Sequence, residues 1–90
     1  MYYKAPEGHN CAYNDTISSG NICQDASKFL GLEYGYGLDG GEISDKRYPA
    51  GCFYGSEHGT SYFNRVIDPG EANPNYFSRN GGICSKTGQM

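Results

Sequence analysis

Hydrophobic positions recur at a helical period in one segment of the chain, residues 21–31. The positions that share one helical face are three to four residues apart: Ile22, Cys23, Ala26, Phe29 and Leu30. The positions expected to face water are polar: Gln24, Asp25, Ser27 and Lys28. Asn21 is suited to cap the start with Gln24 as its capping-box partner, and Gly31 to end the helix. The pattern therefore predicts a helix between Asn21 and Gly31.

A hairpin is predicted directly after this helix. Leu32, Tyr34 and Tyr36 alternate with other side chains, and Glu42-Ile43-Ser44 is a second short strand candidate. Between them, Asp39-Gly40-Gly41 supplies glycines that accept the positive φ angles of a tight turn. We expect the two segments to pair with each other.

Three further segments complete the predicted sheet. The aromatic segment 52–54 follows a break at Pro49, and the longest strand candidate covers residues 61–67. Asn80-Gly81 predicts a tight turn before a last short strand at residues 83–84. Each strand is short, and no internal repeat is visible.

The first 19 residues are rich in turn-forming side chains, so we expect an irregular lead-in, with Tyr13 and Ile17 packing inward. One helix then stands among short strands. This arrangement predicts an α+β fold in which the helix packs on a small antiparallel sheet. Ninety residues form a single domain, 1–90, because a chain of this length cannot bury two cores.

The composition changes this picture by indicating that hydrophobic burial needs help. The chain has no Trp, and 14 of its residues are Gly. Small domains with so modest a core are commonly stabilised by disulfides. The four cysteines, Cys11, Cys23, Cys52 and Cys84, are even in number and widely spread, as in disulfide-stabilised extracellular modules. Zinc is disfavoured because no two cysteines form a Cys-x-x-Cys pair.

Four cysteines permit three pairings, and the sequence alone does not decide among them. Cys23 lies on the inward face of the predicted helix, and Cys52 begins an aromatic strand that could lie beneath it. We therefore favour Cys23–Cys52 across the core and Cys11–Cys84 at the ends of the domain. The main rival pairs Cys11 with Cys23 and Cys52 with Cys84.

Charge and hydropathy exclude two classes of partner. The net charge is −3 with only seven Lys and Arg residues, so a basic surface for nucleic acid is not expected. No apolar run approaches the roughly 20 residues of a membrane span, and no signal peptide is recognisable. Asn14-Asp15-Thr16 is an N-glycosylation sequon, which makes Asn14 a glycosylation candidate and fits passage through a secretory pathway.

Several short motifs follow one another along the chain and together form one pattern: Cys11, Ile17-Ser18, the segment Cys23 to Ala26, Leu30-Gly31, Tyr48-Pro49-Ala50-Gly51-Cys52-Phe53-Tyr54, Tyr62-Phe63-Asn64 and Ile83-Cys84. Together they resemble a cysteine-rich module of many predicted proteins of dinoflagellates and other algae and protists. The resemblance covers residues 11–86, with Phe53 where the pattern has Tyr and an insertion-like stretch at 68–80. It implies a disulfide-bonded secretory or luminal module, often embedded in larger proteins, and it carries no established chemistry.

No set of side chains predicts catalysis. The two histidines, His9 and His58, lie in polar loops, and cysteines that pair with each other cannot act as nucleophiles. Three carboxylates are weak calcium candidates, although they lack the spacing of an EF-hand: Asp39, Glu42 and Asp45. A solvated acidic turn explains them better. We expect no cofactor and no enzyme activity.

The chain has nine Tyr and four Phe residues, although it has few Leu, Val and Ile residues. Most are expected to pack in the core with their hydroxyls near water. The rest could form an exposed platform for a partner protein or a glycan: Tyr34, Tyr36, Tyr54, Tyr62, Asn64 and His58.

The sequence thus predicts a non-enzymatic, secreted or luminal module. The first hypothesis is a structural unit of an extracellular coat, appendage or fibre that binds other copies or other proteins. Two alternatives stay open: a glycan-binding module, and a small accessory subunit of a larger complex in an oxidising lumen.

Overall fold

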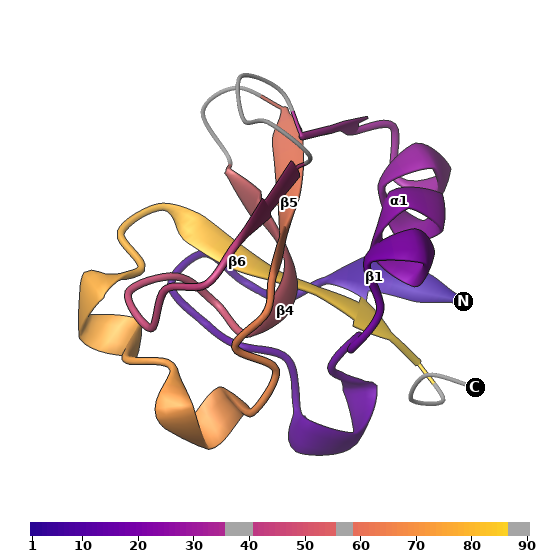
Figure 1. Cartoon of the computed structure of the whole chain (residues 1–90). Helices are drawn as coiled ribbons and strands as arrows, with labels where there is room; N and C mark the ends of the chain where they lie inside the picture. The colour runs from indigo at the N-terminus through magenta and orange to yellow at the C-terminus, as the bar shows by residue number, and fades with distance from the viewer. Residues whose placement is uncertain (36–40, 56–58, 87–90) are drawn as a thin grey trace.

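In a computed structural model, which describes residues 1–35, 41–55 and 59–86, one α-helix packs against a curled mixed sheet (Figure 1). The strands are β1 (Tyr2–Lys4), β2 (Glu33–Tyr34), β3 (Glu42–Ile43), β4 (Gly51–Gly55), β5 (Thr60–Asn64) and β6 (Asn80–Ser85). The helices are α1 (Gly20–Phe29) and the short 3-10 segments η1 (Tyr13–Asp15), η3 (Pro69–Glu71) and η4 (Pro74–Tyr76). The α+β class is confirmed.

The sheet follows the order β1-β6-β4-β5-β2, and β3 also pairs with β5. Strand β4 lies antiparallel to both of its neighbours, β5 and β6, and β1 lies antiparallel to β6. Both β2 and β3, however, run parallel to β5. The prediction of a purely antiparallel sheet is therefore wrong.

The predicted hairpin is also wrong, because its two strands do not pair with each other. Strand β2 lies opposite Thr60 and Ser61, and β3 lies farther along the same strand, opposite Phe63 and Asn64. The chain leaves this edge at Gly35 and returns at Gly41, where an added Cβ would lie 3.1 Å from the Gly35 Cα. Most of the expected Asp39-Gly40-Gly41 turn lies outside the described residues. The glycines thus close a narrow neck rather than a hairpin.

Helix α1 begins two residues earlier than predicted. Ser19, not Asn21, is its N-cap, and the Ser19 hydroxyl accepts the Ile22 N–H at 3.4 Å. At the other end, Gly31 has a φ of +74°. The Leu32 N–H donates to the Ser27 carbonyl at 2.8 Å, and the Gly31 N–H to that of Lys28 at 3.2 Å. These two hydrogen bonds form a Schellman motif. The prediction that Gly31 ends the helix is therefore confirmed.

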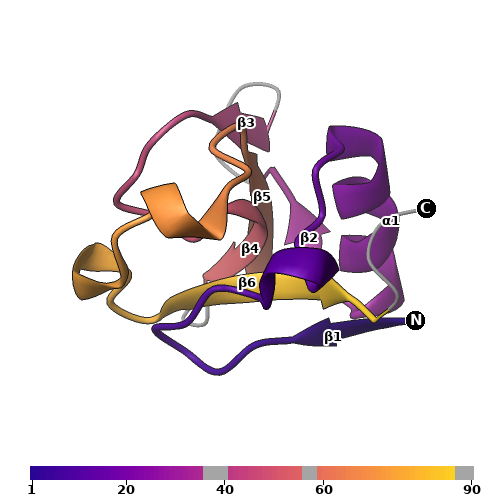
Figure 2. The same cartoon turned by 90° about the horizontal axis from the view of Figure 1, so that it is seen from below.

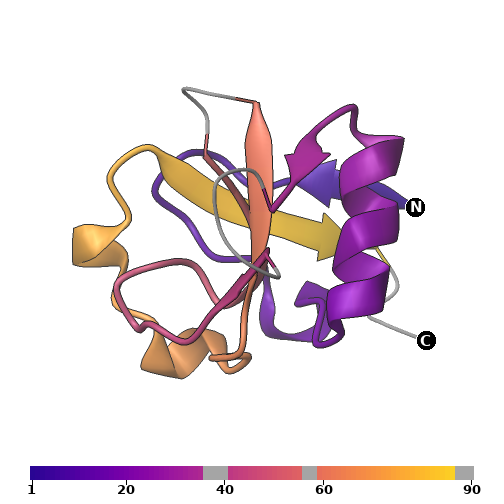
Figure 3. The same ribbon diagram turned by 45° about the horizontal axis from the view of Figure 1, so that its top comes forward.

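The buried face of α1 is turned slightly from the predicted one. Cys23 and Ala26 are fully buried as expected, but Ser27, expected to face water, is buried with them. Phe29, expected inside, is 59% exposed and meets the ring of Tyr2 edge-on at 5.7 Å. In Figure 3 the helix lies on one side of the sheet, while the orange segments η3 and η4 lie on the other.

Two disulfides connect these parts. Cys23–Cys52 joins α1 to β4 with a Cα–Cα distance of 5.2 Å, and Cys11–Cys84 joins the N-terminal segment to β6 at 5.6 Å. These are the two pairings favoured from helix phase. Both bonds lie in the interior, since Cys11 is 5% exposed and the other three cysteines 0%. The cysteines thus form part of the hydrophobic core, together with Ile17, Ala26, Phe63 and Ile83.

The N-terminal segment is more regular than predicted. Strand β1 lies along β6 (Figure 2), and Thr16 forms a β-bridge with Cys84. Ile17 is fully buried as expected, but Tyr13 is 74% exposed. Asn80 and Gly81, predicted to form a turn, begin β6 instead, and the strand predicted to reach Ile67 ends at Asn64. Pairing with neighbouring strands sets the bounds of β1, β5 and β6.

Candidate functional site

Of the six predicted contact residues, Tyr36 and His58 lie outside the described residues. Two of the other four, Asn64 and Tyr54, are buried, at 0% and 4% exposure. The prediction of an exposed platform that includes Asn64 and Tyr54 is therefore wrong. Their polar groups have structural partners, and the two remaining tyrosines are half-buried.

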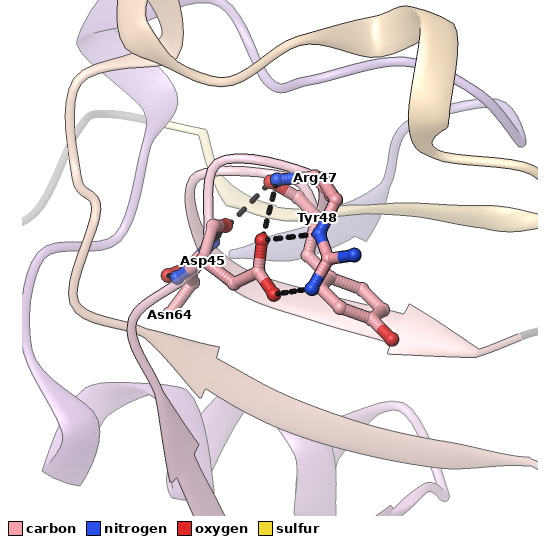
Figure 4. A network of polar contacts seen from close by, with 4 residues as sticks. All are labelled: Asp45, Arg47, Tyr48 and Asn64. Atoms are coloured by element: carbon pink, nitrogen blue, oxygen red, sulfur yellow. Dashed lines mark hydrogen bonds and ion pairs between the residues drawn. The ribbon is translucent and has the colours of Figure 1, made fainter.

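Asn64 holds the turn that precedes β4. Its Nδ2 donates to three carbonyls, those of Asp45 at 2.8 Å, Tyr48 at 3.2 Å and Pro49 at 3.0 Å. Its Oδ1 accepts the N–H groups of Asp45 and Val66, both at 3.1 Å. Figure 4 shows the amide directed into the turn. Because the amide uses both of its N–H groups and its oxygen in this way, nothing remains for a ligand.

Tyr54 fills the space under β1. Its hydroxyl donates to the Ala5 carbonyl, and the Lys4 Nζ lies 5.0 Å above its ring centroid. Burial raises the pKa of this hydroxyl, and the charge of Glu7 adds to the rise. Tyr54 thus links the sheet interior to the edge strand.

Tyr34 and Tyr62 are both half-buried, in different surroundings. Burial raises the pKa of the Tyr34 hydroxyl, and the charge of Glu42 adds to it. The ring of Tyr62 packs against Phe53 at 5.6 Å, and Tyr48 stacks on the same Phe53 at 5.3 Å. The partly exposed tyrosines of this row cover a phenylalanine that is only 2% exposed. This packing agrees with the prediction that most of the aromatic side chains form the core and keep their hydroxyls near water.

The two calcium candidates within the described residues form ion pairs with arginines. The Asp45 carboxylate accepts from the Arg47 Nε at 3.0 Å and Nη2 at 2.8 Å, and the Arg47 guanidinium holds the pKa of Asp45 below its usual range (Figure 4). Glu42 accepts from the Arg65 Nε at 3.0 Å. Asp39 lies outside the described residues. Within the ranges that the structure describes, no group of three or more His, Cys, Asp or Glu side chains could hold a metal ion.

A hollow on another face brings together residues that the sequence does not connect. It has a volume of about 360 Å³, within the range of small-ligand sites. One wall comes from η1 and the residues after it, and the other from the segment after β5. The lining residues are Tyr13, Asn14, Thr16, Ser18, Ile67 and Asp68.

Both walls of the hollow are fixed by hydrogen bonds. On the first wall, the Asp15 N–H and the Thr16 hydroxyl both bond to the Ala12 carbonyl, at 2.9 and 3.0 Å. The Tyr3 hydroxyl donates to the Asp15 carboxylate, and this bond raises the Tyr3 pKa. On the second wall, the Asp68 carboxylate accepts the Gly70 N–H at 2.9 Å. Hydrogen bonds within the fold thus determine the shape of the hollow.

The hollow also contains two large apolar side chains in contact with water. Tyr13 is 74% and Ile67 45% exposed. Sequence reasoning missed both, because it expected Tyr13 to pack inward and Ile67 to end a strand. The one signal in the sequence that points here is the sequon that follows Tyr13, since Asn14 is exposed and lines the hollow.

No known family model matches the chain, and no curated protein or solved structure is significantly similar to it. Over the part of the chain that the structure describes, no helix is both long and apolar enough to cross a membrane. The two disulfides are compatible with an oxidising secreted or luminal location.

Proposed function

We propose that this chain is a non-enzymatic assembly module of an extracellular or luminal structure, and that it binds a second copy of itself through the outer edge of β1. The observation that carries the proposal is an edge of β1 that pairs with no described strand and lies beside exposed apolar side chains. Edges of this kind are templates for another strand.

The outer edge of β1 carries backbone groups that no described strand uses. Among the described strands, β1 pairs with β6 alone. The bonds from Lys86 N–H to the Met1 carbonyl and from Ala5 N–H to the Gly82 carbonyl show that odd-numbered residues face β6. In an antiparallel ladder the alternate residues then direct their peptide groups outward. Tyr2 and Lys4 are therefore available to a neighbouring strand.

Apolar side chains next to this edge add area for a contact. Met1 is 77% and Phe29 59% exposed, and the Tyr2 ring joins Phe29 to the edge strand. Burying such groups in an interface is favourable by roughly 25 cal/mol per Å². The net charge of −3 is small enough for two copies to approach each other at physiological salt. The edge and the patch together favour self-association.

The proposed function also includes an oxidising extracellular or luminal compartment. Closing the two disulfide loops, of 29 and 73 residues, removes about 3.5 and 4.5 kcal/mol of unfolded-state entropy in the chain model. A domain that depends on this contribution needs an oxidising environment. The resemblance to cysteine-rich algal and protist modules supports the same location. An accessory subunit in an oxidising lumen would use the same edge with a different chain.

Sedimentation velocity over a range of protein concentrations tests the assembly. We expect a concentration-dependent rise in the sedimentation coefficient of the oxidised protein. Phe29→Ser should weaken the association by removing apolar area. Lys4→Pro should weaken it by removing an outward N–H while leaving the ladder to β6 intact.

A matched control separates association from folding. Tyr3→Pro removes an N–H on the side that faces β6, so it should lower stability. Lys4→Pro should lower the unfolding midpoint less than Tyr3→Pro, because it keeps the bonds to β6 and loses only the contact between the Lys4 side chain and the Tyr54 ring. A strict monomer at millimolar concentration would overturn self-assembly. Free thiols at the four cysteines of the native protein, found by mass spectrometry after alkylation, would overturn the compartment.

A further inference from the structure

The hollow between η1 and the segment after β5 has the chemistry of a sugar-binding surface. It combines an exposed aromatic ring and an exposed aliphatic side chain, Tyr13 and Ile67, with a hydroxyl and a carboxylate, Ser18 and Asp68. Its other lining residues are polar as well, so the hollow offers hydrogen-bonding groups on both sides of the apolar pair: Asn14 and Thr16. A pyranose ring fits it because its C–H face packs on the apolar pair and its hydroxyls face the polar groups.

Asn14 adds a covalent anchor at the same place. It is exposed, it lines the hollow, and it begins the sequon Asn14-Asp15-Thr16. We propose that Asn14 carries an N-linked glycan whose first N-acetylglucosamine lies in the hollow against Tyr13 and Ile67. This inference rests on the secretory location in the proposed function, and it does not depend on self-assembly.

The modification is a transfer of an oligosaccharide from a polyprenyl diphosphate donor of the secretory pathway. The bond between the anomeric carbon of the first sugar and the diphosphate oxygen breaks. A bond forms between that carbon and the Asn14 Nδ2, which loses one proton, and the polyprenyl diphosphate leaves. No oxidation or reduction occurs.

The order of synthesis makes Asn14 accessible to this reaction. In the folded protein the Thr16 side chain is not free, because its hydroxyl donates to the Ala12 carbonyl and the residue is only 8% exposed. Thr16 and the neighbouring Cys11 are held by Cys84, through a β-bridge and a disulfide. Since Cys84 is synthesised about 70 residues after Asn14, the sequon is unfolded when it enters the lumen.

The proposal explains why two large apolar side chains face water in a domain with so small a core. A sugar bound to Asn14 would cover Tyr13 and Ile67, and it would be held there at high effective concentration by its own linkage. The glycan would then stabilise the folded state, because the contact cannot form in the unfolded chain.

The test is secretion of the oxidised chain from a eukaryotic host behind a cleavable signal peptide. We expect an intact mass that includes one glycan, absent from Asn14→Gln and retained in Thr16→Ser. Trimming to a single N-acetylglucosamine should preserve a thermal midpoint above that of unglycosylated protein from an oxidising bacterial periplasm. A nuclear Overhauser effect should connect the acetamido methyl group to the Tyr13 ring.

Tyr13→Ala and Tyr76→Ala form the matched pair, since Tyr13 and Tyr76 are both exposed, at 74% and 60%. Tyr13→Ala should remove most of the midpoint shift that the sugar gives, and Tyr76→Ala should keep it. Secreted protein with both disulfides and an unmodified Asn14 would overturn the inference and leave the assembly proposal intact. A glycan that gives no midpoint shift and no contact with Tyr13 would overturn the role of the hollow.

Discussion

The hydroxyl of Ser61 on β5 donates a hydrogen bond of 2.6 Å to the hydroxyl of Ser27 on α1, and both residues are 0% exposed. The Ser27 hydroxyl in turn donates to the Cys23 carbonyl at 2.8 Å. A chain of two polar contacts thus lies in an otherwise apolar helix–sheet interface. It allows one position of α1 on the sheet, since any shift along the axis would leave a buried hydroxyl without its partner.

Ser27→Ala should lower the free energy of unfolding by about 1–3 kcal/mol, because the Ser61 hydroxyl loses its acceptor. Ser61→Ala should cost less, since Ser27 keeps its bond to the Cys23 carbonyl. In the double variant the cost should be smaller than the sum of the single costs, as measured by urea unfolding. Strictly additive costs would show that the two hydroxyls do not interact.

Gly51→Ala and Gly31→Ala compare two glycines with nearly equal φ, +70° and +74°. A Cβ at Gly31 would meet nothing within 4 Å, whereas one at Gly51 would lie 2.3 Å from the Ile17 carbonyl oxygen. Gly31→Ala should therefore cost only the left-handed penalty of about 1–2 kcal/mol. Gly51→Ala should cost about 1–3 kcal/mol more because the backbone must move. Thermal unfolding of both variants checks the order, and equal costs would contradict it.

Asn64→Asp should destabilise the fold by at least about 3 kcal/mol, because an oxygen replaces the group that donates to three carbonyls. Asn21→Asp makes the same chemical change at an exposed position in the first turn of α1. There the new charge faces the positive end of the helix dipole, so we expect a small gain in stability. Urea unfolding of the two variants at low salt, where the dipole effect is not screened, should give shifts of opposite sign.

Stability should fall as the pH rises above about 10, where tyrosine in the unfolded chain loses its proton. Burial raises the pKa of Tyr54 and Tyr34, and the bond to Asp15 raises that of Tyr3. The folded state therefore keeps protons that the unfolded state has lost, and the unfolding free energy decreases with pH in this window. Tyr54→Phe should be less stable at neutral pH and show a shallower decline. An unchanged slope would contradict the role of Tyr54.

The sequence predicts well where a local signal and the final packing agree. Helical spacing places Cys23 inward, and this phase favours its bond to Cys52 over the two other pairings, as the structure confirms. The glycine stop at Gly31 is equally local, because a left-handed residue ends the helix whatever the sheet does. The α+β class follows from one periodic segment among short strands.

The rest depends on partners that are distant in the chain. Tyr2–Lys4 has no alternating pattern, and it forms a strand only because β6 offers an edge. Strands β2 and β3 both pair with β5, which comes after them in the chain. Their positions therefore depend on a strand that is synthesised later. Asn64 looks like a surface amide in the sequence, and only the turn at residues 45–49 gives it three acceptors. For the candidate site, the sequon is visible in advance, but the apolar wall at Ile67 is not.

The neck between Gly35 and Gly41 has a consequence for how this fold can vary. The strands on either side of it already occupy neighbouring positions on β5, and Tyr62 alone separates their partners. Lengthening or shortening the segment between the two glycines would leave the register of both strands unchanged. Loop closure entropy also grows only slowly with length. The domain thus has a point at which new sequence can be inserted while the disulfide-linked core stays the same.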